Sequence, residues 1–362
     1  MYRYLIVVED YPNLCGGKAL MYVHTRCIAY MQAGMSITVL NFSSEKEYTI
    51  DGIRVIPVHE FIKNEYEILI MHAPNIRHHF VFLLRYGKFF KGIVLFFHGH
   101  EIVKINKVYP KNYRFNSVKC RMLIQNVYDW FKLSCWRYYL PTIRNRLSIV
   151  FVSSLLQSDF DRFVHIKKSK MPKTVLVINN GIGLEFEINK YNLDSSKEYD
   201  FITIRSNLDS SVYCIDLLCS IANNNPDKKF LLIGRGSFFA YNKKPDNITL
   251  VNAVADHRQL IEFLNSARAA IMLTRRDSQG LMACEIASFG MPMITSNISI
   301  CHEMLGGFPN VLFVDNEKVA SIDLSRITVP CSYFNNTRFY QENTVDKEIR
   351  LLQQIGDGGS CF

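Results

Sequence analysis

The stretch AAIMLTRRDSQGLMACEIASFGMP, residues 269–292, decides the fold. A short apolar run, AAIMLT, is followed by the polar loop RRDSQG and then by residues with helical spacing from Leu281 to Gly290 and Pro292. This order predicts a buried strand, a loop and a helix of about nine residues, which is one step of an open parallel sheet. Sheets of this kind bind ligands at the carboxyl ends of their strands, where a helix N-terminus offers free N–H groups.

Similar apolar runs recur on both sides of this stretch, with helical spacing between them. The first series is YLIVV (4–8), MSITVLNF (35–42), EILIM (67–71), GIVLFF (92–97) and LSIVFV (147–152). The second series is TVLVIN (174–179), YDFITI (199–204), KKFLLIG (228–234), ITLVNAV (248–254), AAIMLT and MPMITS (291–296). Because strands that alternate with helices form parallel βαβ units, we expect an α/β chain with two Rossmann-like sheets.

The composition changes between the two series, around residues 165–198, where KKSKMPK (167–173) and YNLDSSKE (191–198) are polar. Such a change is typical of a domain boundary. We therefore expect an N-terminal Rossmann-like domain at 1–175 and a C-terminal one at 176–335. Residues 336–362 contain a last stretch of helical spacing and a tail.

Composition excludes several classes of protein. With 48% hydrophobic residues, 25 Phe and 19 Tyr in 362 residues, the chain has too much apolar surface to stay disordered. Its apolar runs are shorter than the ~18 residues that a membrane span needs, so we expect no transmembrane helix. MYRYLIVVED at the start favours a buried strand over a signal peptide. The ten cysteines contain no CxxC pair, which favours buried thiols in a reducing compartment.

The net charge of +9 is concentrated in one part of the chain. Residues 84–146 contain thirteen Lys and Arg against two acids, a local charge of +11. Within 104–146 the cations alternate with aromatic residues, among them both tryptophans, Trp130 and Trp136. Three interpretations stay open: an anionic membrane surface, a nucleic-acid site, or a core helix with a solvated basic rim. We favour the membrane surface and expect no nucleic-acid partner.

Two acids frame the start of the helix in the deciding stretch. Asp277 and Glu285 are separated by seven residues, with Gly280 between them. This pattern resembles the E-x7-E region of GT-B glycosyltransferases of family four. The resemblance implies that Glu285 holds the nucleotide ribose and that Asp277 contacts hydroxyls of the donor sugar, although Asp is one methylene shorter than the usual Glu. Gly280 and Leu281, at the helix start, would receive the diphosphate.

Two segments of the first series extend the resemblance. YPNLCGGKAL (11–20) resembles the glycine-rich loop after the first strand, which implies that Gly16 and Gly17 lie against the diphosphate or the acceptor. VLFFHGHE (94–101) resembles the strand-HG element, which implies that His98 faces the donor sugar. His72 and His100 are further candidates.

The second series supplies the remaining candidates. IRSN (204–207) places Arg205 as in the family's R-x4-K diphosphate clamp, and LLIGRGSF (231–238) matches its G-x-G turn with Gly234 and Gly236. The clamp lysine is missing, because Ser210 stands at its position. Candidate substitutes are Arg235, Arg275 and Arg276.

We expect no metal cofactor. DFD (159–161) falls in a stretch of helical spacing, where residues two apart do not face each other, and no His/Cys cluster has metal-ligand spacing. Arg205 and helix dipoles would neutralise the diphosphate instead.

The resemblance implies a retaining GT-B glycosyltransferase whose last helix returns to the first domain. Its donor would be a UDP- or GDP-sugar, and its acceptor a lipid-linked saccharide in surface polysaccharide synthesis at the cytoplasmic face of the plasma membrane. Two alternatives stay open: a GT-B sugar-nucleotide 2-epimerase, and a non-catalytic protein that binds a nucleotide sugar or a polysaccharide. A Rossmann oxidoreductase is disfavoured because no GxGxxG follows the first strand.

Overall fold

The structure is a computed structural model that describes residues 2–14, 19–116, 119–252, 257–324 and 336–357. It divides into two compact units. The first comprises 1–105, 125–181 and 341–362, and the second comprises 106–124 and 182–340. Unlike the contiguous domains expected from the sequence, the second unit includes a segment from the N-terminal half of the chain.

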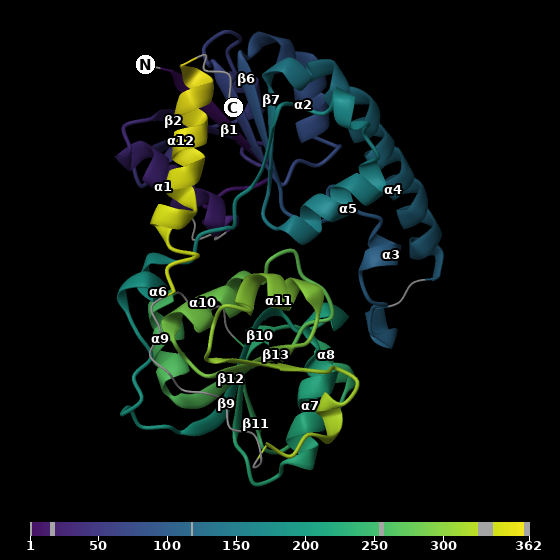
Figure 1. The fold of residues 1–362 in the computed structure, drawn as a ribbon, viewed down its shortest axis with the longest axis vertical. Coiled ribbons are helices and arrows are strands. Elements are labelled where there is room, and N and C mark those ends of the chain that lie inside the picture. Colours follow the sequence, from purple (N-terminus) through teal and green to yellow (C-terminus); the bar gives the residue numbers. More distant parts are fainter. Residues whose placement is uncertain (1, 15–18, 117–118, 253–256, 325–335, 358–362) are drawn as a thin grey trace. The chain divides into compact units, whose positions relative to one another are not determined.

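An eight-stranded sheet forms the centre of the first unit (Figure 1). Its strand order is β3-β4-β2-β1-β5-β6-β7-β8, and every neighbouring pair is parallel except β3 with β4. The strands are β1 (Arg3–Val8), β2 (Ser36–Asn41), β3 (Tyr48–Ile50), β4 (Ile53–Ile56), β5 (Ile68–His72), β6 (Gly92–Phe97), β7 (Leu147–Phe151) and β8 (Thr174–Val177). Every residue of β5, β6 and β7 is buried, as expected for parallel strands covered on both faces.

The expectation that TVLVIN opens the second series is wrong. Its strand, β8, pairs with β7 at the edge of the first sheet, Ser148 opposite Thr174. Because its residues are partly or fully exposed, its burial pattern also fits an edge strand. The chain enters the second unit only after residue 181.

Five longer helices accompany the first sheet: α1 (Met21–Gln32), α2 (His79–Tyr86), α4 (Lys119–Tyr139), α5 (Ser154–Val164) and α12 (Val345–Gly356). The division between the units falls within α4, and the short helix α3 (Ile105–Val108) lies at the first crossing. Helix α12 returns to the first unit, and its apolar side chains join the core formed by β1, β2 and α1.

A buried ion pair anchors α12. Arg26 Nε on α1 lies 3.1 and 3.0 Å from the two carboxylate oxygens of Glu348 on α12. Tyr30 donates to the same carboxylate at 2.6 Å, and Arg26 also donates to Asn180 at 2.8 Å. All three hydrogen bonds to Glu348 are buried, and breaking them would leave a charged group buried without its partner. They therefore fix the C-terminal helix in its position on α1.

The second unit contains a fully parallel six-stranded sheet in the order β11-β10-β9-β12-β13-β14. Its strands are β9 (Tyr199–Asn207), β10 (Phe230–Arg235), β11 (Ile248–Val251), β12 (Ala267–Met272), β13 (Met293–Ser296) and β14 (Val311–Val314). Its helices are α6 (Leu184–Ile188), α7 (Ile215–Asn224), α8 (Phe238–Tyr241), α9 (His257–Asn265), α10 (Leu281–Phe289) and α11 (Ser299–Leu305).

Aromatic residues fix the segment 106–124 to the second unit. Tyr113 packs edge-on against Phe238 at 4.9 Å, and Phe115 stacks on Tyr241 at 4.7 Å. Both belong to the rim of the second unit's hydrophobic core. These two aromatic residues of the basic segment 104–146 therefore serve as packing residues of the second unit.

In the part of the chain that the structure describes, no helix combines the length and the apolar character needed to cross a membrane.

Candidate functional site

The strand order of the second sheet marks where a ligand would bind. Numbered along the chain from β9, the order is 3-2-1-4-5-6, so the direction of winding reverses between β9 and β12. In doubly wound sheets the crevice outside the carboxyl ends of the strands at this reversal is the ligand site. Arg205 lies near the carboxyl end of β9, and the loop RRDSQG follows β12.

Arg205 is a buried cation with an unused donor. The residue is 7% exposed, Nη2 donates to the carbonyl oxygen of Leu273 at 2.5 Å, and among the residues that the structure describes Nε has no partner. Burial lowers the pKa of Arg205, and the nearby Asp277 carboxylate opposes that effect. A guanidinium stays charged in proteins, so the carboxyl end of β9 holds a positive charge that can still donate a hydrogen bond.

Gly234, near the end of β10, and Gly236, just after it, let this end of β10 approach the end of β9 and the turn that follows it. A Cβ at Gly234 would lie 2.1 Å from the carbonyl oxygen of Arg205, and one at Gly236 would lie 2.9 Å from Oδ1 of Asp209. The same Oδ1 accepts a hydrogen bond from the amide of Ser237 at 2.7 Å. The two glycines thus position the backbone that carries Arg205, a role the sequence did not distinguish from direct ligand contact.

Helix α10 begins at Leu281, as predicted, and it has no capping side chain. Gly280 precedes it with φ 75°, a left-handed conformation that favours glycine, and Gly290 ends it with φ 88°. Asp277 organises the loop before the helix, because its Oδ1 accepts hydrogen bonds from the amides of Ser278 and Gln279 at 2.8 and 3.3 Å. The helix start therefore leaves backbone donors for an anion, next to an acidic side chain.

Glu285, one turn into α10, is buried with a 3% exposed side chain. Its Oε1 accepts a hydrogen bond from the amide of Gly183 at 3.2 Å and lies 3.6 Å from Nε2 of His257. Burial raises its pKa to about 7, against the opposing effect of His257. The carboxyl group is therefore near the midpoint of its titration at neutral pH and can accept hydrogen bonds from a diol when ionised.

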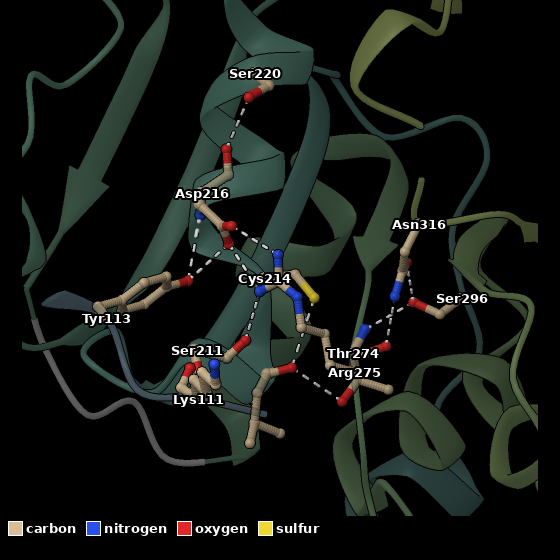
Figure 2. Close-up of polar contacts among 11 residues, drawn as sticks. Lys111, Tyr113, Ser211, Cys214, Asp216, Ser220, Thr274, Arg275, Ser296 and Asn316 are labelled. Atoms are coloured by element: carbon tan, nitrogen blue, oxygen red, sulfur yellow. Dashed lines mark hydrogen bonds and ion pairs between the residues drawn. The ribbon is translucent and has the colours of Figure 1, made fainter. Parts of the chain in front are cut away.

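Arg275 does not offer a free charge in place of the missing clamp lysine. Figure 2 shows its guanidinium against the carboxylate of Asp216, with Nη1 and Nη2 donating at 3.0 and 2.6 Å. Tyr113 donates to the same carboxylate at 2.8 Å, and Ser211 accepts from Arg275 at 2.7 Å through its carbonyl oxygen. These bonds outweigh burial and raise the pKa of Arg275, so its role in the structure is to tie the loop after β12 to the loop after β9.

His98 lies in the first unit, directly after β6. Its Nε2 is 3.3 Å from Nδ1 of His72, and its ring is 4.9 Å from that of Tyr22. Burial lowers the pKa of His98 to about 3, with a smaller effect from the Arg26 cation. It is a neutral imidazole at physiological pH, suited to hydrogen bonding rather than to charge stabilisation.

The remaining predictions concern glycines and metals. Gly16 and Gly17 lie outside the described residues. Among the residues that are described, no three His, Cys, Asp or Glu side chains gather as a metal site would require. The expectation that no metal is needed stays a prediction.

Sequence reasoning missed Gly183 and His257 as partners of Glu285. Gly183 is 102 residues from Glu285 along the chain, and His257 lies on a different helix, α9. Gly183 falls in the segment 165–198, which the sequence marked only as a domain boundary, and nothing in the sequence singled out His257.

No protein-family model and no curated protein sequence matches this chain. Solved structures do. Sucrose-phosphate synthase from Thermosynechococcus elongatus matches with a TM-score of 0.72 at 15% identity over 99% of this chain and 100% of that one. HepE of Anabaena, in complex with UDP and glucose, matches with a TM-score of 0.62 at 11% identity over 99% and 100%. WaaG, a glycosyltransferase involved in lipopolysaccharide biosynthesis, matches with a TM-score of 0.56 at 11% identity over 88% of both chains.

At these identities the similarity concerns the fold. The α/β class and the two Rossmann-like sheets expected from the sequence are confirmed, and the chain has the GT-B fold of these glycosyltransferases.

Proposed function

We propose that this protein is a glycosyltransferase that moves a sugar from a nucleotide-sugar donor to a hydroxyl group of an acceptor. The observation that carries the proposal is Arg205, a buried guanidinium at the winding reversal of the second sheet, whose Nε has no partner within the described part of the chain. An unpaired N–H on a buried cation favours an anionic hydrogen-bond acceptor, and the diphosphate of a nucleotide sugar is such an acceptor.

The reaction breaks the bond between the sugar C1 and the diphosphate oxygen and forms a bond from C1 to the acceptor oxygen. Negative charge builds on the leaving diphosphate, where Arg205 and the start of α10 at Gly280 and Leu281 would stabilise it. The acceptor proton passes to the leaving phosphate oxygen, so the protein needs no separate base. Fixed donors at a developing charge contribute about 2.7–4 kcal/mol each, so Arg205 and the helix start together would supply part of the barrier lowering, and positioning of the two substrates would supply more.

Two further residues of the second unit would hold the donor. Glu285 would accept hydrogen bonds from the ribose diol, and Asp277 would bind hydroxyls of the sugar. The resemblance also assigns His98, in the first unit, to the sugar, as a neutral hydrogen-bonding group. These assignments rest on the resemblance of the sequence to family four, as does retention of the anomeric configuration. They are supported by the burial of Glu285 and by the neutral state of His98.

A direct test is a panel of UDP- and GDP-sugars incubated with the protein, with and without a lipid-linked saccharide acceptor, and with EDTA in parallel. The proposal predicts release of nucleoside diphosphate and an acceptor-dependent product, unaffected by EDTA, with the donor's anomeric configuration in its NMR spectrum. A new nucleotide sugar formed without acceptor would identify an epimerase instead. Binding of the donor with no turnover would identify a binding protein.

The acceptor we propose is a lipid-linked saccharide in surface polysaccharide synthesis, used at the cytoplasmic face of the plasma membrane. The support is a set of large apolar side chains on the outer surfaces of two helices of the first unit, each more than half exposed: Val81 and Leu84 on α2, and Val127, Trp130, Phe131 and Tyr138 on α4. The two helices are in contact, since Phe80 packs edge-on against Trp136 at 5.2 Å.

Charge near these side chains suits anionic lipid headgroups. Arg85 and Lys88 are exposed beside Leu84. The two acids of residues 84–146, Glu101 and Asp129, are both buried, so they do not offset the exposed cations. Basic residues next to exposed aromatic side chains bind the headgroup region of anionic membranes, with about 1 kcal/mol from each cation.

Sedimentation with phosphatidylcholine vesicles, with and without phosphatidylglycerol, tests this surface. We expect binding that requires the anionic lipid and that falls at least tenfold in a Trp130→Ser, Phe131→Ser variant. Leu193→Ser, which removes an exposed apolar side chain of the second unit, is the matched control and should bind normally. Equal binding by all three proteins would overturn the membrane assignment.

A further inference from the structure

His257 occupies an unusual position in the second unit. Its ring lies between two carboxylates, with Nδ1 3.3 Å from Oε2 of Glu185 and Nε2 3.6 Å from Oε1 of Glu285. The ring also packs edge-on against Phe186, with the centroids 5.4 Å apart. An imidazolium in this position can direct one N–H toward each carboxylate, whereas a neutral imidazole can serve only one of them.

The chain is built to accommodate this ring. A Cβ at Gly183 would lie 2.3 Å from Nδ1 of His257 and 2.4 Å from its Cε1, so only glycine fits beneath the imidazole. Because the amide of Gly183 also donates to Oε1 of Glu285, the same residue seats the histidine and holds the carboxylate. The side chain of His257 is 41% exposed, whereas that of Glu285 is 3% exposed, so the histidine contacts a buried acid from the solvent side.

Oxygen Oε1 of Glu285 is thus held from two directions. Among the described residues, no donor forms a hydrogen bond with its second oxygen, Oε2. A ribose diol has two hydroxyl donors, and it would find one carboxylate oxygen unengaged and the other fixed in place.

We propose that His257 is a positioning residue of the nucleotide site, which keeps Glu285 ionised and oriented so that it can accept the ribose hydroxyls. This inference rests on the proposed function, because it assigns the ribose to Glu285. It adds a residue on α9 that acts through the carboxylate rather than on the reacting atoms.

The physical reason is the burial of Glu285. A buried carboxyl group holds its proton more tightly, and a protonated carboxyl has lost part of its capacity to accept hydrogen bonds. Among the described residues, the titratable groups that act on it are His257 from α9, which favours the ionised form, and Glu185 from α6, which disfavours it. Without the histidine, the balance shifts toward the protonated acid.

The proposal therefore predicts how nucleotide binding depends on pH. In the wild-type protein the affinity for UDP or GDP should weaken as the pH falls through about 7, where burial places the pKa of Glu285. In His257→Asn the midpoint should move to higher pH. A midpoint raised by one unit lowers the ionised fraction at pH 7 about fivefold, so affinity should fall about fivefold there and stay within about twofold of wild type at pH 9.

Calorimetric titration of UDP and GDP from pH 6 to 9 tests this, with His302→Asn as the matched control. His302 is an exposed histidine on α11 of the same unit, and its replacement should leave the profile unchanged. A His257→Asn profile that coincides with wild type would overturn the proposal. A profile lowered by the same factor at every pH would also overturn it, because that is the signature of a direct ligand contact.

A second measurement does not need the nucleotide. In ¹³C NMR spectra of the free protein, the side-chain carboxyl of Glu285 should titrate at higher pH in His257→Asn than in wild type, and an unchanged titration refutes the proposal. If no nucleotide binds while the carboxyl titration moves, the proposed function fails. If the nucleotide binds and the titration does not move, only the role of His257 fails.

Discussion

Replacing Glu285 by Gln should stabilise the second unit at neutral and alkaline pH. The glutamine side chain can still accept the hydrogen bond from the amide of Gly183, but it carries no charge into the buried site. Burial raises the pKa of Glu285 from 4.5 to about 7. Each unit of pKa difference between the folded and unfolded states corresponds to 1.36 kcal/mol, so ionising this group in the folded unit costs about 3 kcal/mol.

The sign follows from where the proton is held. Below pH 4.5 both states are protonated and the variant gains nothing. Between pH 4.5 and 7 the unfolded state releases its proton first, so the free energy of unfolding of the wild-type unit falls as the pH rises, and above pH 7 it levels off. The advantage of Glu285→Gln should therefore grow from near zero at pH 4.5 to about 3 kcal/mol at pH 8.

Hydrogen exchange of the slowest amides in α10 and β12 measures this free energy in the second unit alone, at pH 5, 6, 7 and 8. The variant should exchange more slowly at pH 8 and converge with wild type toward pH 5, while it loses nucleotide binding. An advantage that is independent of pH, or a variant that is less stable throughout, would refute the reasoning. A buried acid that lowers stability is expected where function requires it.

Three further changes test other parts of the structure. Glu348→Gln leaves Arg26 buried without its anionic partner and should destabilise the first unit by about 3–5 kcal/mol. Tryptophan fluorescence in urea measures this loss, since both tryptophans belong to that unit. A loss below about 1 kcal/mol would contradict the anchoring of α12. Gly234→Ala brings a Cβ to within 2.1 Å of the Arg205 carbonyl oxygen and should weaken nucleotide binding at least tenfold. Gly307→Ala is the control, because its Cβ would meet nothing nearer than 3.7 Å, and it should bind normally. Equal effects of the two changes would contradict the role of Gly234 in positioning Arg205. Tyr113→Phe removes a 2.8 Å hydrogen bond to Asp216 and should weaken the packing of segment 106–116 by about 1 kcal/mol. Hydrogen exchange over 106–116 should then be faster. Unchanged exchange would contradict the packing of this segment on the second unit.

The strands could be predicted because they are continuous apolar runs. GIVLFF became β6 with the same limits, and AAIMLT and MPMITS overlap β12 and β13. The sequence did not reveal which sheet takes β8, because its partner is chosen by backbone pairing with β7 rather than by its own residues. The short strands β3, β4 and β14 were missed. Length alone does not explain this, because β8, β11 and β13 are also four residues long and were expected.

The basic aromatic segment shows a similar limit. Trp130 and Trp136 are six residues apart on one helix, yet the first is 65% exposed and the second is fully buried against Phe80 and Phe97. Which side of α4 faces the core depends on what the rest of the first unit packs against it. Composition alone could not separate the packing aromatics from the exposed ones.

The candidate site divides in the same way. Arg205, Asp277 and Glu285 were named from the resemblance of their segments to family four. In the structure they lie near the end of β9, in the loop after β12 and one turn into α10. The engagement of Arg275 by Asp216 and the approach of His257 to Glu285 join residues that are far apart along the chain, and no local pattern records them. Such long-range contacts decide which cation is available to a ligand and which acid is ionised.

The central claim is that Arg205 and the start of α10 bind the diphosphate of a nucleotide. Equilibrium binding of UDP, GDP, uridine and guanosine to wild type and to Arg205→Gln tests it most directly. We expect at least one of the two diphosphates to bind to wild type and to bind at least about tenfold more weakly to Arg205→Gln, because a charge-assisted hydrogen bond to the phosphate is lost. The affinity for the corresponding nucleoside should be unchanged. Equal binding of the diphosphate by both proteins, or no binding of either diphosphate to wild type, would contradict it.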